Sequence, residues 1–188
     1  NIHGGDKSIL PDLIAAAKHL EEMGCKCITS SCGYFAHFQK EVAEAVSIPV
    51  CLSTITLIPF LLSLLKSEEK LALICYNKSK LTANLFKACN VTDYMLEKCV
   101  IRDVINEKEF SNIIKDQGHY NITNARNELI KIAENIVKDY RIGAFLLECT
   151  DMPPCSFYIQ KKLNLPVFDA TLMVKFLQRI YGRIENED

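Results

Sequence analysis

The 188-residue chain contains no tryptophan and only seven glycines, and neither a G-x-G-x-x-G nor a P-loop pattern occurs among them. Because these patterns hold the phosphates of dinucleotides and nucleoside triphosphates, both cofactor classes are without support. A charge excess of one sign is also lacking, since 22 Lys and Arg residues face 23 Asp and Glu residues with no basic stripe. Nucleic acids are bound through clustered positive charge, so nucleic-acid binding is not expected. We expect a small-molecule ligand instead.

Long apolar segments are scarce. The uncharged run Ile48–Leu65 contains two prolines and several hydroxyl side chains, so it is interpreted as a strand, a polar loop and a helix rather than a membrane span. No signal peptide is recognised, and we expect a cytoplasmic protein without membrane association. The opening residues NIHGGD read as a loop, which suggests that a first strand is missing from the sequence.

Cysteine is abundant, with nine residues, an odd number that leaves at least one thiol unpaired. Most lie in or beside apolar runs, where a free cysteine behaves as a small hydrophobic residue. A secreted disulfide scaffold would be shorter and richer in loops, so a reducing compartment is expected. Cys25 and Cys27 are separated by one residue and lack the spacing of a zinc knuckle, so no metal site is predicted.

Two of the cysteines lie in segments that read as copies of one another, Ile28–Ser53 and Phe145–Ala170. In both segments the cysteine, Cys32 or Cys149, is followed seventeen residues later by a Pro-Val pair. Each copy predicts an apolar strand, the cysteine, a helix and a second short strand. The chain therefore reads as an internal duplication with a thiol at each transition from strand to helix.

Strands separated by helices along the whole chain predict an α/β fold with mainly parallel sheets. We expect two similar Rossmann-like lobes with the active site in the cleft between them. The first lobe is expected to span residues 1–68, joined by a C-terminal helix at 170–184, and the second to span residues 69–169. The clearest individual predictions are a strand at Lys70–Tyr76, a helix at Ala125–Lys138, a strand at Gly143–Leu147 and a helix at Pro153–Leu163.

The chemistry follows from where the two thiols stand. In an open parallel sheet, ligands bind beyond the carboxyl ends of the strands, and two thiols from related halves would face one another there. Backbone N–H groups at a helix start lower the pKa of a neighbouring thiol and bind carboxylates. One thiolate and one thiol on opposite sides of a carbon could then remove and return a proton.

The strings ITSSCGYF and LLECTDMPP, each followed by its Pro-Val strand, resemble the signature regions of the aspartate/glutamate racemase family. That group of cofactor-independent enzymes also includes hydantoin racemases, arylmalonate decarboxylases and maleate isomerases. The resemblance implies a racemase of an amino acid such as aspartate or glutamate, without cofactor, and suggests a homodimer. It implies that Cys32 and Cys149 form the acid/base pair, with Ser31, Gly33 and Thr150 as contacts to the substrate carboxylate.

Weaker candidates for substrate contacts follow the ends of two further predicted strands; they are Ser53, Thr54, Asn77 and Ser79. Alternation along the strand predicts that Glu148 points away from Cys149, and His37 is interpreted as a helix-surface residue. Two alternatives stay open. One is a related enzyme, such as a hydantoin racemase, decarboxylase or maleate isomerase, that uses a cysteine. The other is a non-catalytic protein that binds small carboxylates.

Overall fold

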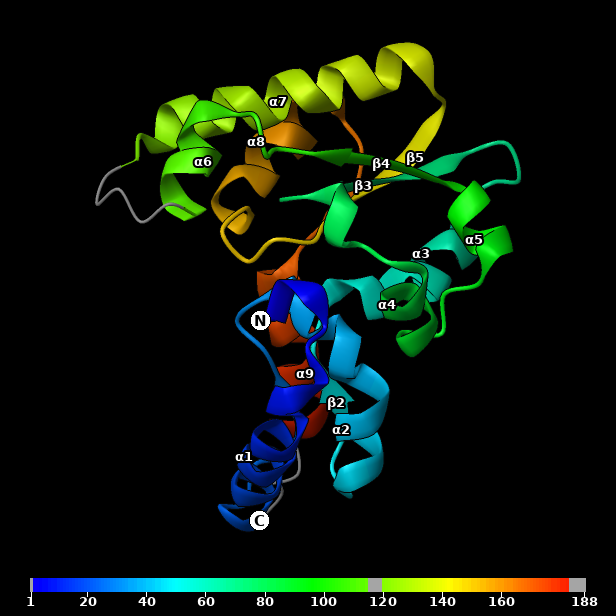
Figure 1. The fold of residues 1–188 in the computed structure, drawn as a ribbon. Helices are drawn as coiled ribbons and strands as arrows, with labels where there is room; N and C mark the ends of the chain where they lie inside the picture. Colours follow the sequence, from blue (N-terminus) through cyan, green and yellow to red (C-terminus); the bar gives the residue numbers. More distant parts are fainter. Residues whose placement is uncertain (1, 115–119, 183–188) are drawn as a thin grey trace.

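The computed structural model describes residues 2–114 and 120–182 (Figure 1). Positions 183 and 184 of the predicted C-terminal segment lie outside the described residues. The strands form two parallel sheets, which confirms the predicted α/β class. The smaller sheet pairs β1 (Ile28–Thr29) with β2 (Val50–Cys51). The larger sheet has the order β4 (Cys99–Asp103), β3 (Lys70–Cys75), β5 (Ile142–Leu147) and β6 (Val167–Phe168).

Helices connect these strands throughout. The α-helices are α1 (Leu10–Glu22), α2 (Gln39–Ala45), α3 (Ile58–Ser63), α4 (Ala83–Ala88), α5 (Asp93–Glu97), α6 (Lys108–Ile114), α7 (Ile122–Asp139), α8 (Pro153–Leu163) and α9 (Ala170–Tyr181). The 3-10 helices are η1 (Ile2–Gly4), η2 (Lys7–Ile9), η3 (Gly33–Phe38), η4 (Thr54–Leu57) and η5 (Lys78–Lys80). Among the described residues, none of these helices combines the length and the apolar character that a membrane crossing requires.

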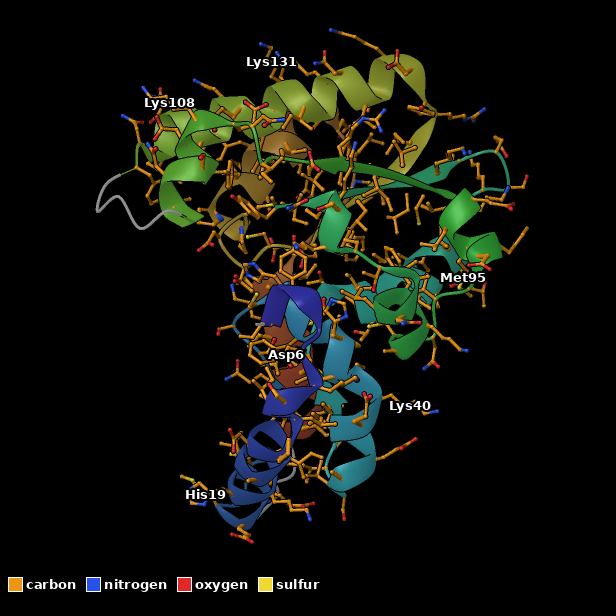
Figure 2. The ribbon with its side chains drawn as sticks, viewed as in Figure 1. Asp6, His19, Lys40, Met95, Lys108 and Lys131 are labelled. Atoms are coloured by element: carbon orange, nitrogen blue, oxygen red, sulfur yellow. The ribbon has the colours of Figure 1, made fainter. Side chains whose placement is uncertain are left out.

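The larger sheet is buried on both faces, and successive residues of β3 serve opposite sides. Leu71 and Leu73 pack with α3 and α4, whereas Ala72 and Ile74 pack with α7 and α8. Figure 1 shows α7 and α8 on one side of this sheet and α3 and α4 on the other. Charged side chains point outward from this body, as Lys131 of α7 does in Figure 2.

The smaller sheet has its own apolar cluster, which includes Ala17 of α1, Ile28 of β1 and Val42 of α2. Helix α9 reaches this sheet from the other end of the chain, since the Cys51 thiol lies 3.3 Å from Sδ of Met173. In Figure 1, α1, α2 and α9 gather around β2, away from α7. We propose that the two sheets are the centres of the two expected lobes. A third cluster crosses the proposed boundary at residue 68 and joins Ile55 and Ile58 to the larger sheet.

The duplicated segments adopt the same local structure. Ile28 is aligned with Val50 in the first copy, and Phe145 is aligned with Val167 in the second, at the same offset of twenty-two residues. The N–H of Ile28 donates to the carbonyl of Pro49 at 2.9 Å, and the N–H of Phe145 donates to the carbonyl of Pro166 at 2.8 Å. The repeated sequence spacing is thus a repeated β-helix-β unit.

Candidate active site

Cys32 lies just beyond β1 and is the N-cap residue of η3. Ser30 helps to hold it there, because the Ser30 hydroxyl lies within hydrogen-bond distance of the carbonyls of Cys32, at 2.9 Å, and Leu52, and donates its one proton to either of them. Burial raises the pKa of the Cys32 thiol, the backbone N–H of Tyr34 lowers it, and the charges of Glu148 and Asp151 raise it further. The expected lowering by the helix start is therefore present but is outweighed by burial.

Cys149 holds the matching position beyond β5, one residue after Glu148. Its Sγ atom is 3.6 Å from Oδ2 of Asp151. Burial raises the pKa of the Cys149 thiol, the backbone N–H of Asp151 lowers it, and the carboxylates of Glu148 and Asp151 raise it again. Burial thus favours the protonated form of both half-buried thiols.

A direct hydrogen bond joins the two cysteine segments. The Thr150 hydroxyl donates to the carbonyl of Ser31 at 2.6 Å, so the residue after Cys149 contacts the residue before Cys32. Among the predicted site residues, the structure therefore brings together Ser31, Cys32, Gly33, Cys149 and Thr150. A hydroxyl has one proton, so Thr150 cannot donate to Ser31 and to a carboxylate at the same time.

Glu148 lies inside this group, on the side of Cys32 and Tyr34, whereas Cys149 packs on the other face of the larger sheet, as strand alternation predicts. Its side chain is 1% exposed and packs against Gly33, where a Cβ atom would lie 2.0 Å from Oε1. Neither carboxylate oxygen makes a hydrogen bond of normal geometry with the described residues. Burial raises the pKa of Glu148 to about 7, and the nearby backbone N–H of Tyr76 offsets this only in part.

Tyr34 lies beside Cys32 and Glu148 in this group of site residues. Its hydroxyl donates to the carbonyl of Asn77 at 3.0 Å and accepts from the N–H of Asn77 at 2.8 Å. These two bonds fix the end of β3 against η3. Burial raises the pKa of Tyr34, and the charge of Glu148 raises it further. No feature of the sequence pattern singled out Tyr34, although it stands two residues after Cys32.

The side chains of the weaker candidates for substrate contacts mainly make hydrogen bonds within the protein. Ser53 is the N-cap residue of η4, and the hydroxyl of buried Thr54 donates to the carbonyl of Leu147 at 3.2 Å. The side-chain oxygen of Asn77 accepts from the backbone and the hydroxyl of Ser79, which is exposed. His37 is buried rather than on the helix surface, and it lines a separate cavity of about 620 Å³.

The structure also bears on a metal site. Within residues 2–114 and 120–182, no three His, Cys, Asp or Glu side chains are arranged to hold a metal ion. All nine cysteines are free thiols. The groups present in the candidate site are thiols, carboxyls, a phenol and backbone N–H groups, which are suited to proton transfer.

Comparison with known sequences gives lyases as relatives. No protein family matches the chain. It is 29% identical over 170 residues to a dimethylsulfoniopropionate lyase of Durusdinium sp. clade D, covering 88% of this chain and 55% of the relative. It is also 29% identical over 178 residues to dimethylsulfoniopropionate lyase 3 of Emiliania huxleyi (strain CCMP1516), covering 86% and 45%. The chain thus spans about half the length of these curated relatives.

Comparison with solved structures gives racemases and a decarboxylase. An aspartate racemase homologue from Pyrococcus horikoshii OT3 matches with a TM-score of 0.65 and 22% identity, covering 92% of this chain and 74% of the other. Allantoin racemase from Klebsiella pneumoniae matches with a TM-score of 0.64 and 16% identity, covering 93% of this chain and 65% of the other. An arylmalonate decarboxylase in which a glycine is replaced by cysteine matches with a TM-score of 0.62 and 14% identity, covering 97% of this chain and 78% of the other. The chain therefore has the same fold as these racemases and this decarboxylase.

Proposed function

We propose that this chain provides two thiols of an active site that removes a proton from a carbon next to a carboxylate. The observation that carries the proposal is the hydrogen bond from Thr150 to Ser31, which joins the segments of Cys32 and Cys149. Each thiol stands beyond the carboxyl end of a parallel strand, the usual location of a ligand site in such sheets.

Among reactions of this kind, we favour the cleavage of dimethylsulfoniopropionate, because the curated relatives are lyases of that compound. A cysteine thiolate takes a proton from the carbon next to the carboxylate. The electrons of that C–H bond form the double bond of acrylate, while the bond from the neighbouring carbon to sulfur breaks. Dimethyl sulfide leaves with that electron pair, and the thiol returns its proton to solvent.

This elimination needs a base on one side of the substrate, and the positive sulfonium group makes dimethyl sulfide a good leaving group. Burial disfavours the thiolate at Cys32 and Cys149. A cationic substrate in the site would favour the thiolate, because an opposite charge stabilises the ionised form of an acid. Substrate binding and activation of the base would thus be coupled.

The test is to incubate the protein with dimethylsulfoniopropionate, without added cofactor, and to measure dimethyl sulfide by gas chromatography and acrylate by proton NMR. We expect both products in equal amounts, and loss of activity in the Cys149→Ser or Cys32→Ser variant that removes the base. Cys25→Ser is a matched control outside the site. Unchanged turnover in both single variants would overturn the assignment.

Amino-acid racemisation is a second candidate, favoured by the presence of two thiols from two copies of one structural unit. A racemase needs both, one to remove the α-proton and the other to supply a proton to the opposite face. Aspartate and glutamate in heavy water test it: loss of the α-proton signal that requires both cysteines would support it. Hydantoins and maleate extend the panel to the other activities that the fold superfamily includes.

We also propose a cytoplasmic, reducing environment, because nine free thiols in one chain suit a compartment in which disulfides do not persist. The homodimer stays a prediction. Gel filtration in the presence of a reductant would measure the oligomeric state directly.

A further inference from the structure

Glu148 is a buried acid that the reaction above does not use, next to Cys149 in the sequence and in contact with the residue after Cys32. Glu148 is 1% exposed, and its carboxylate packs against Gly33, the residue after Cys32. Neither oxygen is accessible to solvent or makes a normal hydrogen bond with the described residues. We therefore consider its influence on the groups packed around it.

The groups that feel the charge of Glu148 come from three elements. They are Cys32 and Tyr34 at the start of η3, Cys75 at the end of β3, and Cys149 beyond β5. Asp151 adds a second negative charge that acts on both site thiols. Among the described residues, no Lys, Arg or His contributes to the titration of Glu148. An ionised Glu148 is thus surrounded by acids, without a compensating cation.

We propose that Glu148 is a positioning residue whose protonation controls the two thiols: the neutral carboxyl permits a thiolate at Cys32 or Cys149, and the ionised carboxylate keeps both protonated. The physical reason is that a negative charge in a poorly solvated site disfavours a second negative charge beside it. Glu148 and each thiol then titrate as a coupled group rather than independently. This inference rests on the proposed use of both cysteines in proton transfer.

The test measures thiol ionisation directly and does not require turnover. Iodoacetamide reacts with thiolates, so the rate of alkylation at each cysteine, followed by peptide mass spectrometry across a pH series, reports its ionisation. The proteins are the parent, Glu148→Gln and, as a control, Glu109→Gln. Glu109 is a buried carboxylate in α6 that accepts from the N–H of Asn121 at 2.8 Å, outside the cysteine site.

In Glu148→Gln we expect alkylation of Cys32 and Cys149 at pH 8 to be faster than in the parent by about threefold or more, which corresponds to at least half a pKa unit. Cys25 should react equally in all three proteins, and Glu109→Gln should match the parent. A purely structural role for Glu148 would give general exposure of all nine cysteines instead. Unchanged alkylation of both site cysteines in folded Glu148→Gln would overturn the proposal.

A measurement on the parent alone applies if Glu148→Gln does not fold. The pKa of Glu148 is about 7, so its ionisation should produce an inflection near neutral pH in the alkylation profiles of the site cysteines. Cys25 should show a smooth rise. Profiles of Cys32 and Cys149 without the inflection would contradict the proposal. The inflection without activity on any substrate would instead support the role of Glu148 and count against the proposed function.

Discussion

Gly33 and Glu148 are in such close contact that an ideal Cβ atom at Gly33 would lie 2.0 Å from Oε1 of Glu148 and 2.7 Å from its backbone carbonyl oxygen. These residues belong to different copies of the repeated unit, and each is next to one of the two cysteines. A glycine at position 33 therefore allows the two cysteine segments to approach one another. The contact depends on the missing side chain and not on an unusual backbone conformation.

Gly33→Ala is the direct test of this contact. Because the added methyl group overlaps both a side chain and a backbone atom, we expect a loss of about 1–3 kcal/mol in the free energy of unfolding, measured by urea denaturation. Gly182→Ala is the control, since nothing lies within 4 Å of its Cβ position. Gly33→Ala with the stability of the parent would show that the two segments can separate at little cost.

Glu148 makes stability depend on pH. Its pKa is about 7 in the folded protein, compared with 4.5 for an ordinary glutamate, so the folded state holds a proton that the unfolded state has lost between these values. The stability that this group contributes is fully present below about pH 4.5 and is lost as the pH rises through 7. The change corresponds to about 3 kcal/mol.

Glu148→Gln removes this titration, so its stability relative to the parent should increase from about pH 5 to pH 8. Urea denaturation at both pH values measures the difference, with Glu109→Gln as the matched control. An equal difference at the two pH values would mean that Glu148 is already ionised throughout, against the raised pKa.

The hydrogen bond from Thr150 to Ser31 should influence both stability and turnover. Thr150→Val keeps the shape of the side chain but removes the donor, which we expect to cost about 1 kcal/mol in unfolding free energy. Since the bond fixes the spacing of the two cysteine segments, kcat should fall by about tenfold or more. Thr123→Val, at an exposed position of α7, should change neither quantity. Full activity of Thr150→Val would remove the main geometric support for the joint site.

Tyr34→Phe should destabilise the junction between η3 and the end of β3. The change leaves the N–H and carbonyl of Asn77 without the hydroxyl that now serves both, at a cost of about 1–3 kcal/mol. Tyr94→Phe, at a side chain that is 69% exposed, is the control. Thermal unfolding of the two variants gives the comparison, and equal midpoints would contradict the expected role of the hydroxyl.

The sequence alone determined the parallel α/β arrangement and the repeated cysteine unit. Both depend on local information: apolar runs of strand length, helical periodicity, and an identical spacing from Cys32 to Pro49 and from Cys149 to Pro166. The structure reproduces that spacing as an identical register in the two copies. The predicted helix after Cys32 is divided into η3 and α2, a local difference that leaves the unit intact.

The tertiary structure decided the surroundings of the thiols. Strand alternation places Glu148 on the face opposite Cys149, but it does not reveal that the Glu148 carboxyl packs against Gly33 from the other copy. Likewise, a helix start can be read from sequence as a source of N–H groups, whereas the carboxylates of Glu148 and Asp151, which also raise the pKa of the Cys32 thiol, come from more than a hundred positions away. Contacts between distant segments, which no local pattern encodes, set the acidity of this site.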